Sequence, residues 1–152
     1  MSMIKIRLLS ENSKSPIYEH KGDAGMDIFS NEYKELDVGC RQLVNTGISI
    51  EIPYGYYGRI SAKSGLCMKG IDIGAGVIDY GYTGEIKVFM FNNGQNKYIV
   101  NMHDKIAQLI VEKIIDSPIL VIYDKDWNKI DEKKYEKDYE RSDKGFGSTG
   151  LI

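Results

Sequence analysis

The segment from Gly74 to Ile86 contains the residues best suited to chemistry, two glycines followed by an aspartate and a tyrosine. Gly74 and Gly76 would leave backbone N–H and C=O groups open to a flat ligand, whose edge they can read by hydrogen bonding. Asp79 would then stand near a phosphate of that ligand as a carboxylate base. The alternative is a plain hairpin in which Asp79 caps the turn and Tyr82 covers its edge. Taken alone, the segment favours this hairpin.

A second segment, from Ser61 to Leu66, has groups that suit an anion. It ends an apolar run and could open a helical turn, where the amides of Ser64 and Gly65 would donate hydrogen bonds and Lys63 would add a positive charge. A serine cap followed by a tight turn explains the same residues at least as well. The segment therefore indicates an anion site only in combination with other signals.

Near the C-terminus, Arg141 precedes a glycine-rich segment that contains Ser148 and Thr149. A guanidinium group presents a planar fork of donors that matches phosphate oxygens, so these residues could clamp a terminal phosphate. By itself the segment is a polar tail. Glycine-rich ends of this kind are either disordered or act as lids that order on a ligand, and composition alone favours disorder.

The acidic residues that could bind a metal are spread along the chain: Asp23, Asp27, Asp79 and Asp104. This spacing disfavours a cage made wholly of protein ligands and fits Mg²⁺ held mostly by phosphate and water. The two histidines, His20 and His103, are far apart in the sequence, which disfavours a zinc site built on histidine.

The composition predicts one globular domain without affinity for polyanions. The chain has 152 residues, 42% of them hydrophobic and 28% charged, which is ordinary for a packed domain. A formal net charge of −2 provides no basic field for a nucleic-acid backbone, so any phosphate must be bound locally. Cys40 and Cys67 form no C-x-x-C pair, and no signal or membrane-spanning stretch is present. We therefore expect a cytoplasmic or otherwise intracellular protein with reduced thiols and no membrane partner.

Short β-type runs separated by Gly, Pro, Asn and Asp fill most of the chain. The alternation from Ile48 to Ile52 places every second residue on a buried face. Such runs predict an all-β sandwich or barrel, with one short helix at residues 64–68. The predicted strands are 4–9, 47–52, 56–62, 71–79, 85–91, 97–100, 106–114 and 119–123.

Beyond these runs the composition changes to mixed charge. We interpret residues 1–124 as the β-sandwich, residues 125–140 as a charged linker and residues 141–152 as a glycine-rich arm of the same domain. A short helix is the alternative for the linker.

Five segments, in this order and spacing, resemble the motifs of the trimeric dUTP pyrophosphatase (dUTPase) family. They are Asp23 to Ile28, Lys63 to Leu66, Gly76 to Gly84, Asp104 to Leu109, and Arg141 with Gly145 to Gly150. Each motif is weak alone, but together they span nearly the whole chain, and five coincidences would be needed to explain them otherwise.

The resemblance implies a distorted jelly-roll β-sandwich with a flexible C-terminal arm. It implies a homotrimer with composite active sites, in which the arm of one chain closes the site of a neighbour. The implied reaction is Mg²⁺-dependent hydrolysis of dUTP to dUMP and pyrophosphate by attack of water on the α-phosphorus. This reaction limits uracil incorporation into DNA and supplies dUMP for thymidylate synthesis.

The resemblance also assigns roles by matched position. Asp79 corresponds to the general base, Tyr82 to the ring under the deoxyribose, and Phe146 to the ring that stacks on uracil. The hairpin backbone at Gly76 and at Lys87 would pair with uracil, and Asp27 would contact the water shell of the metal. The remaining substrate-binding positions are Lys63, Ser64, Gly65, Val77, Ile78, Gln108, Arg141, Gly147, Ser148 and Thr149.

Some positions depart from the family pattern. Arginine is usual at the places of Lys63 and Lys105, and glycine is common near His103 and usual at Ser142. Lysine would replace a bidentate contact by a single one.

Two other functions remain open. A dCTP deaminase of the same fold, or a bifunctional relative that also hydrolyses the triphosphate, would carry a glutamate where Phe89 stands, and an apolar ring cannot shuttle protons. A non-catalytic nucleotide-sensing trimer is disfavoured by the presence of Asp79 and of the complete arm motif.

Overall fold

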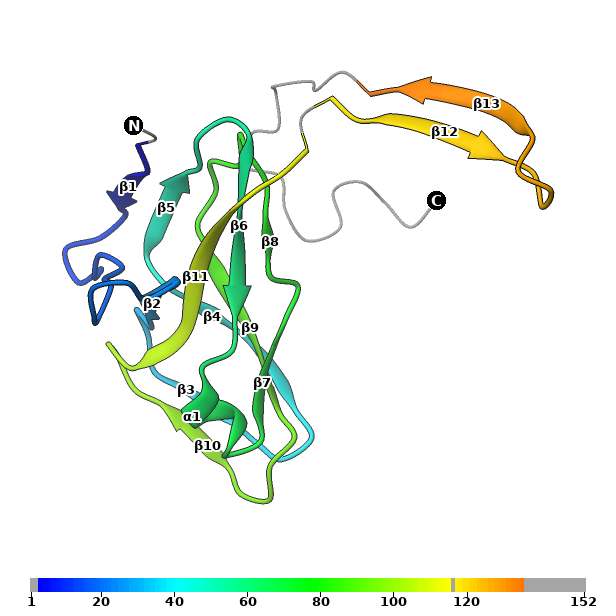
Figure 1. The fold of residues 1–152 in the computed structure, drawn as a ribbon. Coiled ribbons are helices and arrows are strands. Elements are labelled where there is room, and N and C mark those ends of the chain that lie inside the picture. The colour runs from blue at the N-terminus through cyan, green and yellow to red at the C-terminus, as the bar shows by residue number, and fades with distance from the viewer. Residues whose placement is uncertain (1–2, 116, 136–152) are drawn as a thin grey trace.

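The computed structural model describes residues 3–115 and 117–135, and two antiparallel sheets form the body of this part of the chain (Figure 1). The larger sheet has the strand order β2-β11-β6-β8, and the second has the order β4-β9-β7. The strands of the larger sheet are β2 (Gly25–Phe29), β11 (Lys105–Lys113), β6 (Tyr56–Ser61) and β8 (Val77–Ile78). Those of the second are β4 (Arg41–Asn45), β9 (Lys87–Asn92) and β7 (Ile71–Gly74).

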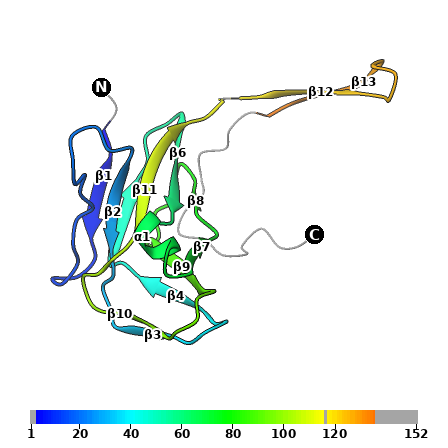
Figure 2. The ribbon, with the colours of Figure 1, turned by 60° about the horizontal axis from the view of Figure 1, so that its bottom comes forward.

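Two further strand pairs join segments that are distant in sequence. Strand β1 (Lys5–Leu8) pairs with β5 (Ile48–Glu51), and β10 (Tyr98–Val100) pairs with β3 (Lys34–Leu36), both antiparallel. Figure 2 shows β10 and β3 together at one end of the molecule, below α1 and β4. The arrangement is a distorted jelly-roll β-sandwich, so the predicted all-β class is confirmed.

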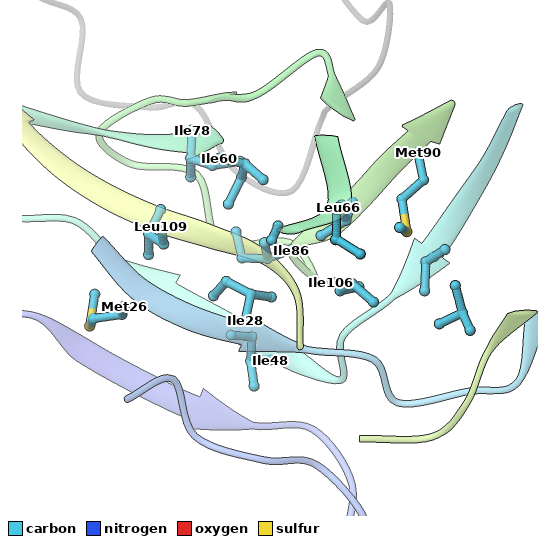
Figure 3. Packing of buried hydrophobic residues seen from close by; sticks show 14 of the residues in the cluster. Met26, Ile28, Ile48, Ile60, Leu66, Ile78, Ile86, Met90, Ile106 and Leu109 are labelled. Atoms are coloured by element: carbon cyan, nitrogen blue, oxygen red, sulfur yellow. The ribbon is translucent and has the colours of Figure 1, made fainter. Parts of the chain in front are cut away.

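One contiguous hydrophobic core lies between the layers (Figure 3). Alternation along the strands determines which residues enter it: on β9, Val88, Met90 and Asn92 are buried and the residues between them are only half-buried. Ile28, Ile86, Ile106 and Leu109 are fully buried. Removing such side chains from water is the main favourable contribution to folding.

Three strands that the sequence pattern does not predict are present between residues 25 and 45. Strand β2 has no polar alternation because four of its five residues are buried, including Asp27. Strands β3 and β4 are short and rich in polar residues, so their pairing with β10 and β9 determines their conformation more than their own composition.

The predicted strand 71–79 is wrong as a single element, because the chain forks within it. Strand β7 pairs with β9, whereas β8 pairs with β6. Between them Ala75 adopts φ 48°, a left-handed conformation that breaks a strand. The plain hairpin between this run and residues 85–91 is therefore also wrong, since only β7 pairs with β9.

Helix α1 (Ser64–Cys67) confirms the short predicted helix and is the one α-helix among the described residues. Its N-cap is Lys63 and makes no side-chain capping bond, so the interpretation of Ser64 as a cap is wrong. In residues 3–115 and 117–135, no helix has the length and apolar character needed to cross a membrane. Cys40 and Cys67 are both free and exposed.

A two-stranded hairpin extends away from the sandwich in Figures 1 and 2. It consists of β12 (Ile119–Tyr123) and β13 (Lys129–Lys134), and all residues of both strands are exposed. The carboxylate of Asp124 closes the turn by accepting hydrogen bonds from the backbone N–H groups of Asp126 and Asn128, both at 2.9 Å. Residues 129–134 of the predicted linker are therefore a strand, because the apolar β12 provides a pairing partner for a charged sequence.

A hydrogen-bonded group on the outer side of the larger sheet links β6 to β11. Glu112 accepts hydrogen bonds from Arg59 at 2.7 and 3.2 Å and from the hydroxyl of Tyr57. These bonds, first that of Arg59 and then that of Tyr57, lower the pKa of Glu112 from 4.5 to about 2. The ionised carboxylate is therefore favoured by folding.

We expect acid to remove the stabilisation that the ionised carboxylate of Glu112 gives to the folded state. Because the pKa is depressed in the folded state, the stabilisation is complete above about pH 4.5 and is lost as the pH falls towards 2. Glu112→Gln should therefore lower the urea midpoint at pH 6, and the difference from the unmutated protein should shrink towards pH 2. Glu51→Gln is the control, since it removes an ion pair whose side chains are 61% and 62% exposed. A pH-independent difference would contradict this account.

Candidate active site

A hollow of about 400 Å³ opens where β6 leads into α1. It is lined by Lys63, Ser64, Gly65, Leu66, Lys69, Lys105 and Gln108. Gln108 is oriented by donating a hydrogen bond from its Nε2 to the carbonyl of Ala62 at 2.9 Å. The hollow thus unites predicted residues of two motifs that are about forty positions apart in the sequence. An antiparallel sheet can place such distant segments on neighbouring strands.

Asp27 lies beside the hollow and organises its lysines. It is only 5% exposed, and its two carboxylate oxygens contact Lys63 and Lys105, the latter at 2.9 Å. Burial raises the pKa of Asp27, but hydrogen bonds and charges from the two lysines outweigh burial and bring the pKa below 3.8. Asp27 is therefore ionised at neutral pH.

Lys105 has a second carboxylate partner, Glu19, at 2.5 Å. The hydrogen bonds that Lys105 donates to Glu19 and then to Asp27 raise its pKa above 10.5. Sequence analysis missed Glu19, because nothing in the local pattern links residues 86 positions apart. Each carboxylate contact here is made by a lysine.

His103 also departs from the family pattern, and its backbone shows why glycine suits the position. His103 adopts φ 70°, in the left-handed region that glycine occupies without strain. Its Nε2 lies 2.7 Å from the carbonyl oxygen of Asn12, which ties the turn before Asp104 to the N-terminal segment.

Gly74 and Gly76 lie at the fork between β7 and β8. The carbonyl of Gly76 accepts a hydrogen bond from the N–H of Ile60 at 2.7 Å, and a Cβ at position 76 would collide with the carbonyl oxygen of Ile60. Glycine is therefore required here by the close approach of two backbones. Val77 is exposed, whereas Ile78 is buried in the core and can meet a ligand only through its backbone.

Asp79 and Tyr82 form the turn after β8. Asp79 is half-buried, and its carbonyl accepts a hydrogen bond from the N–H of Tyr82 at 3.2 Å. The hydroxyl of Tyr82 donates to the carbonyl of Glu85 at 3.1 Å, and its ring packs against the core. The Tyr82 side chain is therefore held in a defined position, and Asp79 directly follows the end of β8. Lys87 follows as the first residue of β9, with its Nζ 3.9 Å from Glu85.

The predicted site residues fall into two groups along β6. Gly58 pairs with Ile78, so Asp79, the next residue, lies towards the start of β6, whereas Lys63 follows the end of β6 at Ser61. At about 3.3 Å per residue, the base and the hollow are on the order of 20 Å apart in one chain. Arg141, Phe146, Gly147, Ser148 and Thr149 lie outside the described residues.

The chain is similar to known proteins in sequence and in structure. A family model described as dUTPase matches residues 11–150. The chain is 38% identical to a deoxyuridine 5'-triphosphate nucleotidohydrolase of Yarrowia lipolytica, over 97% of this chain and 89% of that protein. It is 40% identical to the protein of the same name from Paramecium bursaria Chlorella virus 1, over 99% and 100%.

Solved structures give the same result. A mutant dUTPase from phage phi11 of S. aureus, described with a coordinated structural Mg(II) ion, matches with a TM-score of 0.74 and 30% identity. The match covers 80% of this chain and 97% of that chain. A Staphylococcus bacteriophage 80alpha dUTPase mutant with dUpNHpp matches with a TM-score of 0.76 and 25% identity, over 82% and 98%.

Proposed function

The chain belongs to the dUTPase family and is a dUTP diphosphatase, and from this premise we propose which of its residues bind dUTP and which act on it. The fork between β7 and β8 is the observation that carries the proposal. The ladder of β7 with β9 ends at the pair Gly74–Phe89, and the chain then crosses to β6 at Gly76. Uracil enters beyond this end, where its edge pairs with the backbone at Gly76 and Lys87 as a strand would.

Selectivity for uracil follows from backbone pairing. A base whose donors and acceptors are reversed, such as cytosine, leaves buried polar groups without partners, which costs more than the mere loss of a contact. The requirement for glycine at position 76 keeps the base close to the main chain. Val77 and Ile78 contribute backbone groups to the same wall, and Phe146 of the arm covers the opposite face of the base.

Asp79 acts as the general base. Its carboxylate takes a proton from water as the water oxygen bonds to the α-phosphorus, and the bond from that phosphorus to the bridging oxygen breaks. The products are dUMP and pyrophosphate, and the proton leaves Asp79 to solvent. The position of Asp79 directly after a paired strand supports this role, because a base must be held in a fixed place.

Tyr82 excludes ribonucleotides by shape. Its hydroxyl is engaged with Glu85 and its ring packs on the core, so the ring cannot move aside for a 2′-hydroxyl. The deoxyribose lies on this ring.

The hollow binds the triphosphate of the dUTP molecule on which Asp79 of a different chain acts. Because the hollow and Asp79 are on the order of 20 Å apart along β6, one chain cannot present both to adjacent phosphates. A homotrimer resolves this separation by placing the hollow of one chain beside the fork of another. Ser64, Gly65, Lys63 and Gln108 then hold the phosphates. The arm, residues 141–152, closes the site with Arg141, Gly147, Ser148 and Thr149.

Mg²⁺ fits this donor set when phosphate supplies most of its ligands. The described residues contain no group of three or more His, Cys, Asp or Glu side chains able to hold a metal. Asp27 has acceptor positions beyond those taken by Lys63 and Lys105, and it would bind water of the metal's shell. When bound, Mg²⁺ supplies positive charge that offsets the charge of the triphosphate.

A product assay tests the assignment. Purified protein with Mg²⁺ should release pyrophosphate from dUTP at least about a hundredfold faster than from dCTP, dTTP or UTP, and excess EDTA should suppress the reaction. Ammonia from dCTP would support the deaminase alternative. That outcome is disfavoured by Phe89, whose ring packs edge-on against Phe91 at 4.8 Å and offers no proton. Binding of dUTP without turnover would support the sensor.

A further inference from the structure

Lys69 is a cation in the hollow that belongs to none of the sequence motifs. It follows α1 by two residues, and its N–H donates to the carbonyl of Leu66 at 2.9 Å. The side chain is exposed and lines the hollow together with Lys63, Ser64 and Lys105. Its position is thus determined by the same short helix that positions the serine.

Among the described residues, the side chain of Lys69 contacts an aromatic ring and pairs with no carboxylate. Its Nζ lies 5.8 Å from the centroid of the Tyr98 ring, within the range of a cation–π contact. Across residues 3–115 and 117–135, the ion pairs formed by lysines do not include Lys69. An aromatic ring positions the ammonium group without neutralising it.

The charges around the hollow explain why it is important that Lys69 contacts a ring and not a carboxylate. Lys63 and Lys105 are paired with Asp27 and Glu19, so two cations are balanced by two anions. Lys69 is the remaining charged residue that lines the hollow. The net positive charge available to a polyanion therefore comes from Lys69.

We propose that Lys69 is a further phosphate-binding residue, which supplies the net positive charge that attracts the triphosphate of dUTP into the hollow. The inference rests on the proposed binding of the triphosphate there. Lys69 adds a charge that no carboxylate of the described residues balances, whereas the charges of Lys63 and Lys105 are balanced by Asp27 and Glu19. Tyr98 lines a second hollow, which shares Lys69 with the first.

The test compares Lys69→Gln with Lys69→Arg in the full chain. Lys69→Gln should raise the KM for dUTP about tenfold and leave kcat within about twofold, because a charge-assisted phosphate contact is lost from both the ground state and the transition state. Inhibition by inorganic tripolyphosphate should weaken by a similar factor, while inhibition by deoxyuridine, which has no phosphate, should not change. Lys69→Arg should restore most of the affinity. The matched control is Lys125→Gln, on the hairpin and 86% exposed, which should change nothing.

The variant Ser64→Ala separates this inference from the assignment of the hollow. If Ser64→Ala weakens tripolyphosphate binding and Lys69→Gln does not, Lys69 is not a phosphate ligand although the hollow is correctly assigned. If neither variant affects tripolyphosphate while dUTP is still hydrolysed, both the hollow and Lys69 are wrongly assigned. A fall in kcat with unchanged tripolyphosphate inhibition would indicate a structural role and would likewise overturn the proposal.

Discussion

Asp79→Asn is expected to lower kcat about a thousandfold while the Kd for dUTP stays within about threefold of its unmutated value. General-base catalysis contributes roughly 10² to 10⁴ in rate, and an amide of the same shape cannot accept the proton of the attacking water. The backbone carbonyl of Asp79 that accepts from Tyr82 is unchanged, so the turn should persist. Single-turnover rates and equilibrium binding of dUTP, measured separately, give the two quantities.

Asp72→Asn is the matched control for this experiment. Asp72 lies on β7, is exposed, and stands seven residues before Asp79. The control substitution therefore removes the same charge from a neighbouring part of the chain. Its carboxylate accepts a hydrogen bond from the N–H of Ile73, which the amide oxygen can replace. Turnover should be retained. If Asp79→Asn kept more than about a tenth of the rate, another group would be the base.

Sequence periodicity predicts the strands whose two faces differ and misses those determined by their partners. Strand β11 is predicted within one residue at each end because apolar residues fill most of it, from Ile106 to Val111. Strand β2 is missed because its buried Asp27 resembles a surface residue in the sequence. The carboxylate is buried because two lysines, 36 and 78 positions later, neutralise it.

In the candidate site, too, some residues are predicted from the sequence and others are missed. Resemblance points to Asp79, Gly76 and Ser64, and for Gly76 the structure adds a reason, because a Cβ there would collide with the carbonyl oxygen of Ile60. It does not identify Glu19 or Lys69, which act through charge and can be replaced by other arrangements. The fork between β7 and β8 also escapes prediction, since one apolar run of nine residues gives no sign that its halves pair with different strands.

Removal of residues 141–152 is expected to lower kcat/KM for dUTP by at least about a hundredfold. The deletion removes Arg141, Ser148 and Thr149 together with the ring of Phe146, and loss of even one charge-assisted phosphate contact costs about 1.5–3 kcal/mol. The buried hydrophobic residues of the described part lie between Met26 and Leu109, so the melting temperature should not change. Removal of only Leu151 and Ile152, beyond the motif, is the control and should leave activity intact.

The same deletion reveals whether one site uses several chains. Asp79→Asn keeps an intact arm, and the truncated chain keeps an intact Asp79. If the arm closes the site of a neighbour, mixed trimers formed by co-expression contain sites with both elements and recover activity well above that of either protein alone. If each arm closed the site of its own chain, the mixed trimers would remain as inactive as their parents. Recovery is the result expected from the proposed trimer, in which Asp79 and the hollow, on the order of 20 Å apart along β6, meet from different chains.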